Sequence, residues 1–347
     1  MSKNREVTLL VPGLTQFDTK QLGDMFSERQ SLAALELIYS RGQHHRGSTE
    51  TVEQTLFDLF GLPTVGSTEI PVGALTHYLV KGTDNAERWM MRADPVTIQP
   101  NRDHLVLMGN AAIEISQRDS EQIAADINDT YGDTEWQISV ISSTQWVIEQ
   151  DKPEDITTHG LSHVVGKNIN DFLPRGEDSK KWRALMNELQ MFLHAHPVNQ
   201  QRQTQGLPLL NSLWFWGAGV LPIRMNTDDD KPFVQCWSQE TLSLALARMA
   251  GVPRADLPAD GDEWLRQAIT PGKHLLVIDL LDNDYVKSDP VEWWQALGVF
   301  NERWLMPLVG AVKNKQLEKL ILVNNDGARY QLTRKLANRW WKIIKRI

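Results

Sequence analysis

Residues 274–280 read His-Leu-Leu-Val-Ile-Asp-Leu and residues 320–324 read Leu-Ile-Leu-Val-Asn, and these two runs decide the fold. Both are short and almost entirely apolar, which is typical of strands buried on both faces of a parallel sheet. Between them, large apolar residues recur at helical spacing from Trp293 to Leu305. Strand, helix and strand in this order predict a parallel sheet covered by helices on both faces.

The flanking sequence extends this α/β pattern. Residues 6–11 are expected to form another short buried strand, closed by Pro12-Gly13, and a helix is expected at 51–60. The middle section, from about residue 90 to 193, differs because its strand-like runs are spaced as antiparallel hairpins are. We therefore expect an α/β core with a mostly parallel sheet and a smaller α+β lobe.

The composition is that of an ordinary globular protein. The chain has 347 residues, of which 41% are hydrophobic and 23% charged, and this length favours two domains. The formal net charge of -8 argues against nucleic acid as a partner, because phosphate binding calls for a broad basic face. The 13 tryptophans are spread along the chain, so most are expected in the core.

The sequence predicts neither a signal peptide nor a membrane span. The apolar part of residues 1–12 is too short for a signal peptide, and no run reaches the roughly 18 apolar residues of a membrane span. We expect a cytoplasmic protein.

Cys236 is the single cysteine, which excludes an intrachain disulfide and a cysteine-based zinc site. No histidine lies near it in sequence, so a nucleophilic role has little support.

The densest polar stretch spans residues 190–219. It places two histidines, two asparagines, an arginine, two tryptophans and three glycines between apolar runs. Pro197 ends the preceding helix because it lacks an amide donor. Asn199 and Arg202 offer groups that suit a carboxylate or phosphate, and the final Trp-Gly-Ala-Gly allows close backbone approach. A ligand site and a polar strap with a buried tryptophan pair are equally open interpretations.

The same stretch resembles the cofactor-independent phosphoglycerate mutases of the archaeal type. The shared pattern is His-Pro-Val-Asn, two residues, Arg, three residues, Gly-Leu-Pro, two residues, Asn, and an aromatic strand ending in Trp-Gly-Ala-Gly. Residues 91–97, Met-Arg-Ala-Asp-Pro-Val-Thr, resemble the segment where those mutases enter their inserted domain. Through most of its length the chain is more similar to a bacterial family named after these mutases or labelled a regulator of pathogenicity factors.

This resemblance implies an alkaline-phosphatase-like sheet formed by residues 1–90 and 205–347, with residues 91–204 as an inserted α+β domain. It also implies two metal ions that activate a serine, which carries the phosphoryl group. Such a metal pair needs a cage of carboxylates and imidazoles. Ser48 and Ser67 lie nearest to where the nucleophile would fall, and neither has a recognisable flank.

The cage implied by the resemblance is incomplete in this sequence. Its first carboxylate would end the first strand, where Pro12 stands, and the later strand ends keep acids but no histidines. We therefore predict that two-metal phosphoryl transfer has been lost and that no metal cofactor is held. The alternative is an active mutase or phosphatase whose Mn, Zn or Mg ligands come from Asp279, Asp282, Asp284 and Asp326.

Anion binding without turnover is the function that remains. The predicted ligand residues are Arg92, His196, Asn199, Arg202 and Asn211, which would hold a small phosphorylated or carboxylated molecule between core and insert. We predict a phosphoglycerate-mutase-like protein that acts as a ligand-binding, regulatory or scaffold protein.

Two basic segments lie outside this motif. His44 and His45 belong to a short basic loop that fits an anion site, although a solvated loop is the simpler interpretation. Segment 334–347 has six basic residues and no acid, interleaved with tryptophans and isoleucines. It is expected either to bind an interface or a protein partner or, more simply, to dock its apolar side on its own acidic body.

Overall fold

The computed structural model of this protein describes residues 4–25, 31–62, 69–82, 86–102, 104–109, 113–131, 135–222, 231–282, 286 and 289–344. These residues belong to two compact units. Unit 1 comprises Met1–Pro63 and Arg224–Ile347, and unit 2 comprises Thr64–Ile223. Within the described ranges, no helix has both the length and the apolar character needed to cross a membrane.

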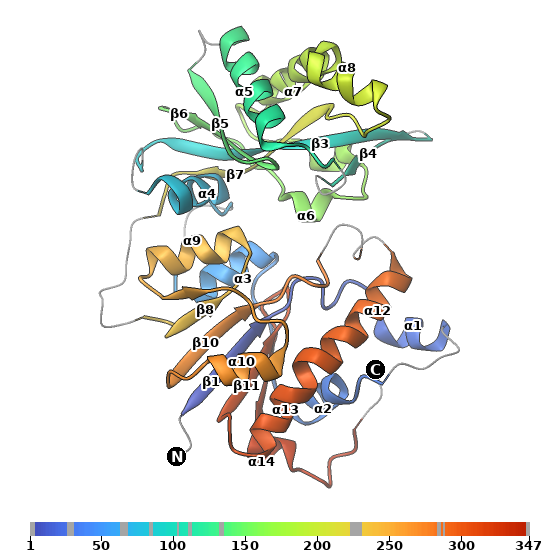
Figure 1. Ribbon diagram of the computed structural model, residues 1–347, viewed down its shortest axis with the longest axis vertical. Coiled ribbons are helices and arrows are strands. Elements are labelled where there is room, and N and C mark those ends of the chain that lie inside the picture. The colour runs from blue at the N-terminus through green and yellow to red at the C-terminus, as the bar shows by residue number, and fades with distance from the viewer. Residues whose placement is uncertain are drawn as a thin grey trace. The chain divides into compact units, whose positions relative to one another are not determined.

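Unit 1 is an α/β structure around one seven-stranded sheet (Figure 1). Its strands are β1 (Arg5–Leu10), β2 (Gln43–His45), β8 (Gln235–Trp237), β9 (Arg254–Ala255), β10 (Gly272–Val277), β11 (Lys319–Val323) and β12 (Arg329–Thr333). Its helices are α1 (Thr19–Met25), α2 (Ala33–Arg41), α3 (Val52–Leu59), α9 (Thr241–Met249), α10 (Gly261–Gln267), α12 (Pro290–Phe300), α13 (Met306–Lys313) and α14 (Arg334–Ala337). A π-helical turn, Asn301–Leu305, joins α12 to α13.

The sheet is mostly parallel. Its strand order is β2-β12-β11-β1-β10-β8-β9, and the strands from β11 to β9 pair in parallel, whereas β12 and β2 extend one edge antiparallel. The two apolar runs that predict the sheet form β10 and β11, which pair with β1 on either side. The predicted α/β class and parallel core are therefore confirmed.

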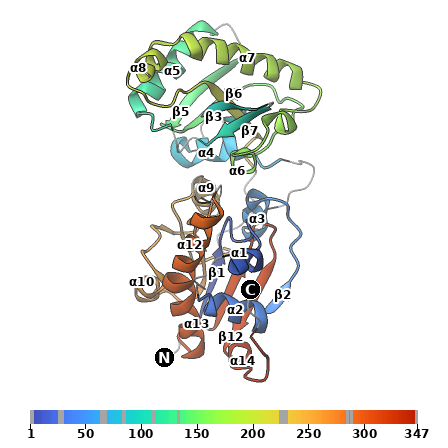
Figure 2. The same ribbon diagram turned by 90° about the vertical axis from the view of Figure 1, so that its right-hand side faces the viewer.

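Both faces of this sheet are covered. Val7 and Leu9 of β1 belong to the core cluster that contains the apolar residues of α12 and α13, which run along one face (Figure 2). Successive strand residues point to opposite faces, so the buried Leu10 points to the other side. There α9 contacts β8 and β9 and packs against α3. The predicted tryptophan-rich helix is thus the main cover of one face, and it continues through the π-helical turn.

Unit 2 is an antiparallel α+β structure. Its strands are β3 (Trp89–Asn101), β4 (His104–Met108), β5 (Trp136–Ser142), β6 (Gln145–Gln150) and β7 (Ser212–Gly219). Its helices are α4 (Val72–Lys81), α5 (Gln117–Thr130), α6 (Leu161–Val164), a 3-10 turn (Ile169–Phe172), α7 (Ser179–Ala195) and α8 (Pro197–Thr204). The long β3 pairs with β4, β6 and β7, and β5 pairs with β6. Helices α5, α7 and α8 lie over one face of this sheet and α4 lies under the other (Figure 2).

The unit boundaries differ from the expected ones at residues 90 and 204. The structure divides the described chain near residues 63 and 223. The reason is packing: α4 contacts β3, β6 and β7, and β7 forms an antiparallel ladder with β3. Residues 69–82 and 205–222 therefore belong with the inserted lobe.

Candidate functional site

The carboxyl ends of β1, β10 and β11 lie together, because these three strands are parallel neighbours. This edge is where open α/β sheets bind ligands, and it is where the resemblance places a metal pair. The segments that leave it are 11–14, 278–282 and 324–327. Their side chains decide whether a metal site can form.

The segment after β1 is closed by contacts with its neighbours. Gly13 N–H donates to Asn325 Oδ1 at 2.9 Å, and Trp293 Nε1–H donates to the Gly13 carbonyl at 2.8 Å. Gly13 has φ of +80°, and a Cβ on it would lie 2.3 Å from the Leu281 carbonyl oxygen. Backbone and amide groups therefore fill the space beside Pro12, where the resemblance would place a carboxylate.

The acids at this edge do not converge. Asp279 is exposed, and Asp326 Oδ1 accepts from the Ala328 amide at 3.0 Å within its own turn. Asp282 is half-buried, with its amide bonded to the Asp279 carbonyl at 2.9 Å, and Asp284 lies outside the described residues. Asn324 Oδ1 is buried without a partner among the described atoms.

The donors that the described residues supply at this edge do not fit a pair of divalent cations. One neutral amide oxygen supplies no charge, and hard cations need several carboxylates. Over the described ranges, no three His, Cys, Asp or Glu side chains come together as a metal-holding group. Of the two candidate serines, Ser48 is exposed and Ser67 lies outside the described residues.

Arg92, the first predicted ligand residue, lies buried on β3 in unit 2. Its guanidinium donates twice to the Asp94 carboxylate, each time at 2.9 Å, and once to Thr76 Oγ1 at 3.2 Å. Trp216 donates from Nε1 to the same carboxylate at 2.8 Å and also stacks under the guanidinium. Arg92 is therefore neutralised by a bidentate ion pair inside its own unit.

The other predicted ligand residues hold the 190–211 segment in place. His196 ends α7 and caps α8, where Pro197 is the first residue: its Nδ1 accepts from the Val198 amide at 3.2 Å, and its Nε2 lies 3.0 Å from Asp126 Oδ2. Proline suits this position because no helical acceptor is required there. The polar segment after the predicted helix end thus begins with a second helix.

Asn199, Arg202 and Asn211 bond to backbone. Asn199 donates to the Leu193 carbonyl at 2.7 Å and accepts from the Leu210 amide at 3.0 Å. Arg202 donates to the carbonyls of Pro208 at 2.8 Å and of Ile113. Asn211 accepts from the Ile98 amide at 2.7 Å and donates to the Ile98 carbonyl at 2.8 Å, extending the strand ladder through its side chain.

These contacts give each of the five predicted ligand residues a role in holding the fold together. We call them, with Asp94, the polar belt of unit 2. The glycines at the end of the motif also serve packing, because a Cβ on Gly217 would lie 2.7 Å from Val72 Cβ and one on Gly219 would lie 2.8 Å from Pro71 Cβ. They allow β7 to approach the start of α4. Ligand binding by the polar belt stays a prediction.

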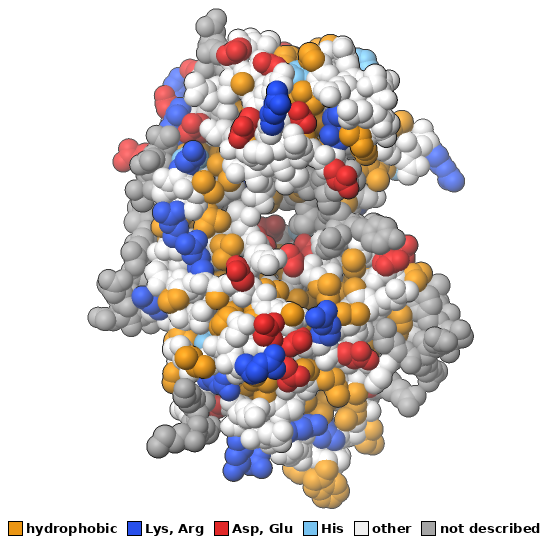
Figure 3. Space-filling model, in the orientation of Figure 1, with side chains coloured by type: hydrophobic (Ala, Val, Ile, Leu, Met, Phe, Trp, Pro, Cys, Tyr) orange, Lys and Arg blue, Asp and Glu red, His pale blue; other side chains and the backbone are white. Residues whose placement is uncertain are grey.

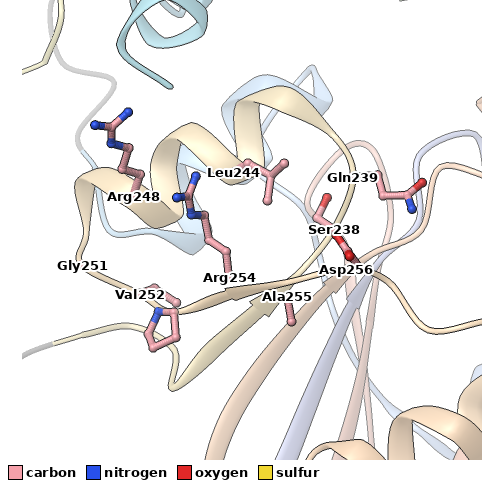
Figure 4. A pocket seen from close by; sticks show the side chains of 10 residues that line it. Ser238, Gln239, Leu244, Arg248, Gly251, Val252, Arg254, Ala255 and Asp256 are labelled. Carbon is pink, nitrogen blue, oxygen red and sulfur yellow. The ribbon is translucent and has the colours of Figure 1, made fainter. Parts of the chain in front are cut away.

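A pocket of about 890 Å³ in unit 1 runs along β9, from the turn that precedes this strand to the carboxyl ends of β8 and β9 (Figure 4). Ser238 and Gln239 follow β8, Asp256 follows β9, and Arg248 comes from α9. Figure 4 shows Arg248 and Arg254 extending in the same direction at one end, with Ser238 and Asp256 towards the other. The remaining lining comes from Leu244 and from the turn Gly251–Ala255.

The charge of this pocket is set by its two arginines. Glu240 is turned inward and caps α9, accepting from the amides of Leu242 and Ser243 at 2.7 Å each, so its carboxylate is not part of the lining. Asp256 is the one acid among the lining residues. Two guanidiniums in a concave site suit a small anion. The Ser238 hydroxyl is buried and accepts from Ser243 Oγ at 2.8 Å and from the Glu240 amide at 2.9 Å.

Cys236 lies in β8, two residues before Ser238 of the pocket lining, and is fully buried. Burial raises the pKa of its thiol to about 12. The thiol is therefore protonated and unreactive at neutral pH, in agreement with the expectation that it is not a nucleophile.

The basic loop borders a second, smaller hollow of about 370 Å³ in unit 1. His45, Arg46, Ser48 and Arg329 line it, and Arg329 forms an ion pair with Asp58. His44 points to the opposite face of the sheet and stacks on Tyr330 at 4.6 Å between ring centroids. The loop is thus one exposed edge strand and its following turn, and its histidines do not act together.

Sequence reasoning missed Arg248, Arg254, Ser238 and Asp256. Each stands in an unremarkable context, and no local motif marks them. The available signal was positional, because 238–239 follow the short apolar strand 235–237 and strand ends carry ligand sites. That strand has three residues and β9 has two, which is too short for periodicity to detect.

Comparisons with known proteins locate the sequence likeness in unit 2. A family model described as 2,3-bisphosphoglycerate-independent phosphoglycerate mutase matches residues 83–199. A probable enzyme of that name from Geobacter sulfurreducens is 27% identical over 132 residues, 38% of this chain and 33% of that protein. One from Methanothrix thermoacetophila is 41% identical over 59 residues, 17% of this chain and 15% of its own. The chain thus matches a third or less of the length of these relatives.

A solved structure extends the likeness in fold. A Pyrococcus horikoshii protein, PH0037, has a TM-score of 0.54 at 14% identity, covering 95% of this chain and 87% of its own. At this identity the likeness shows the fold alone, and it agrees with the expected alkaline-phosphatase-like core with an inserted lobe. Residues 83–199 are thus similar in sequence to the 2,3-bisphosphoglycerate-independent phosphoglycerate mutases, and the likeness to PH0037 extends over the fold of the chain.

Proposed function

We propose that this protein is a cytoplasmic relative of these mutases that no longer transfers phosphoryl groups with two metals and acts by binding. The observation that carries the proposal is the closed edge beside Pro12. There Gly13 bonds to Asn325 and Trp293 in the space where a ligand cage would need acids. A proline, backbone groups and the dispersed carboxylates of the described residues supply fewer ligands than a metal pair requires, which supports the proposal.

The proposed ligand is a small phosphorylated or carboxylated molecule in the pocket beside α9. Arg248 and Arg254 give this pocket a forked, permanently charged pair, and guanidiniums match the planar oxygens of carboxylates and phosphates. One end of the pocket, at Ser238 and Asp256, lies at the carboxyl ends of β8 and β9. This is the usual ligand position in open α/β sheets. Binding without turnover fits a regulator or scaffold, the class implied by the resemblance to the pathogenicity-factor regulators.

A metal and turnover assay tests the loss of catalysis. The protein is purified, incubated with Mn, Zn or Mg, freed of loose metal, and assayed for bound metal, phosphoglycerate mutase activity and hydrolysis of p-nitrophenyl phosphate. We expect neither stoichiometric metal nor turnover, with an archaeal-type mutase as the positive control. Two tightly bound cations with turnover would overturn the proposal and support the alternative set of Asp279, Asp282 and Asp326.

Calorimetry tests the pocket separately. Phosphoglycerate and inorganic phosphate are the probes, and a ligand at 100 times its Kd stabilises the folded state by about 2.7 kcal/mol. We expect the shift in unfolding temperature to vanish in Arg248→Ala with Arg254→Ala and to persist in Arg266→Ala, an exposed arginine of α10. If Arg92→Met abolishes the shift while the pocket variants retain it, the ligand lies at the polar belt and the pocket assignment is wrong.

A further inference from the structure

The segment 334–344, which we call the basic segment, exposes large apolar side chains at the surface of unit 1. The exposed fractions are 83% for Trp340, 66% for Trp341 and 84% for Ile343. The simpler expectation, that the apolar side docks on the protein's own body, holds for the buried Leu336 and Ala337 and fails for these three. Exposing two indole rings is unfavourable in water, so something else is expected to cover them.

The basic segment is held in place at its base. Arg41 donates from Nη1 to the Ala337 carbonyl at 2.7 Å and from Nε to the Lys342 carbonyl at 3.3 Å. Arg334 donates to the Lys313 carbonyl at 3.1 Å. These bonds fix its path over unit 1, so the tryptophans are presented by a folded base.

Cationic side chains accompany the exposed rings. Lys335, Arg339 and Lys342 lie within the basic segment, and it contains no acid, whereas the chain as a whole has 44 acidic residues against 36 basic ones. Figure 3 shows hydrophobic side chains gathered over the segment that follows α14, with Lys and Arg side chains close by. The positive charge is therefore local, on an otherwise acidic protein.

We propose that the basic segment docks unit 1 on an anionic lipid surface. Tryptophan rings settle at the headgroup level of a bilayer, and lysine and arginine stems can reach its phosphates from the same depth. A lipid surface requires no folded groove on the partner, which suits a segment whose only helix is the four-residue α14. An acidic protein or a second copy would need a complementary shape for both indoles.

Vesicle sedimentation tests this proposal with the full chain. We expect binding to phosphatidylcholine vesicles that contain phosphatidylglycerol, and little binding to pure phosphatidylcholine. Raising the salt should weaken binding, because surface charges are screened within about 8 Å at physiological ionic strength. Equal binding to both vesicle types, or none to the anionic ones at low salt, would overturn the proposal.

Two variants connect the binding to the basic segment. Lys335→Glu with Arg339→Glu and Lys342→Glu should lower the partition coefficient by at least fivefold for each charge removed, which is about 1 kcal/mol per residue near the surface. Trp340→Ala with Trp341→Ala should lower it at least tenfold. The controls are Arg118→Glu, an exposed arginine of unit 2, and Ile269→Ala, whose side chain is 66% exposed in unit 1.

The unfolding temperature and the oligomeric state of the variants complete the test. Both basic-segment variants should keep the parental unfolding temperature, so that lost binding is not lost folding. If the tryptophan variant still sediments with anionic vesicles, another surface binds them and the proposal is wrong. If the parent is an oligomer in solution that these variants dissociate, a second copy covers the tryptophans, and the lipid assignment is wrong.

Discussion

The polar belt of unit 2 and the pocket beside α9 in unit 1 place similar side chains in opposite roles. Arg92 and Arg202 are buried, and their donors are bonded to a carboxylate or to carbonyls. Arg254 is exposed and borders an open pocket with Arg248. The residues that are most conspicuous in the sequence are thus used by the fold, whereas Arg254, which no motif marks, is exposed at the pocket.

Burial is the physical basis of this difference. A buried polar group must be hydrogen-bonded, so a long irregular connection such as 205–211 needs many polar side chains to satisfy its backbone. Asn211 does this by bonding to the amide and the carbonyl of Ile98, and Asn199 by bonding to the Leu210 amide and the Leu193 carbonyl near the end of α7. A high density of Asn, Arg and His is therefore as typical of a structural strap as of a binding site.

Removing Asp94 should have the largest effect, because it leaves Arg92 buried and unpaired. We expect Asp94→Ala to lower the free energy of unfolding of unit 2 by about 3–5 kcal/mol. Calorimetric unfolding of the parent and variant measures the loss. The double variant Arg92→Met with Asp94→Leu removes both charges and should lie closer to the parent than the single variant does.

A small loss in the free energy of unfolding for Asp94→Ala would contradict the contrast between the polar belt and the pocket. A cost below about 1 kcal/mol is typical of an exposed ion pair. It would mean that water reaches Arg92 and that this arginine is available to an anion, as the sequence analysis expected.

Gly13→Ala should have the next largest effect on stability. It tests whether the edge of unit 1 beside Pro12 is closed. The backbone at Gly13 has φ of +80°, and the added Cβ would clash with the Leu281 carbonyl. Strain of this kind costs about 1–3 kcal/mol. Gly310→Ala in α13 is the matched control, since nothing lies within 4 Å of its Cβ position and alanine favours a helix.

Thermal unfolding distinguishes the two glycines. Gly13→Ala should lower the unfolding temperature, and Gly310→Ala should leave it unchanged or raise it. If Gly13→Ala is neutral, the edge is open enough to rearrange, and the argument that it is sealed against a metal pair fails.

His274 makes the stability of unit 1 depend on pH. It is fully buried, accepts from Trp237 Nε1 at 3.2 Å and lies 2.9 Å, through Nε2, from the Thr270 carbonyl. Burial lowers the pKa of this imidazole, so below the ordinary value of about 6.5 the unfolded chain takes up a proton before the folded one does.

The free energy of unfolding is therefore expected to fall as the pH falls. Above about pH 6.5 the group has no effect, and below it the free energy of unfolding falls by up to about 1.4 kcal/mol per pH unit until the folded pKa is reached. His274→Gln should flatten this part of the curve relative to the parent. An unchanged pH slope in the variant would mean that His274 titrates alike in both states.

The predictable part of this protein was its framework. The apolar runs at 274–280 and 320–324 are long and uniform enough to identify the parallel core. The loss of the metal cage, inferred from Pro12, stays a prediction. The pocket was not predictable, because β8 and β9 have only three and two residues and their neighbours Arg248 and Arg254 fit no motif. The roles of Asn199 and Arg202 depend on backbone groups that sequence cannot place, such as the Pro208 and Leu210 atoms they contact.

The smallest effect on stability is expected for Arg254→Ala, which sharpens the comparison of the two arginine settings. Arg254 is exposed, and such substitutions change the free energy of unfolding by less than about 0.5 kcal/mol. Arg202→Ala should cost about 1–3 kcal/mol, because it leaves buried carbonyls without donors. Only Arg254→Ala should remove stabilisation by phosphoglycerate measured calorimetrically. If the two variants exchange these behaviours, the ligand belongs to unit 2 and the structural explanation of the polar belt is wrong.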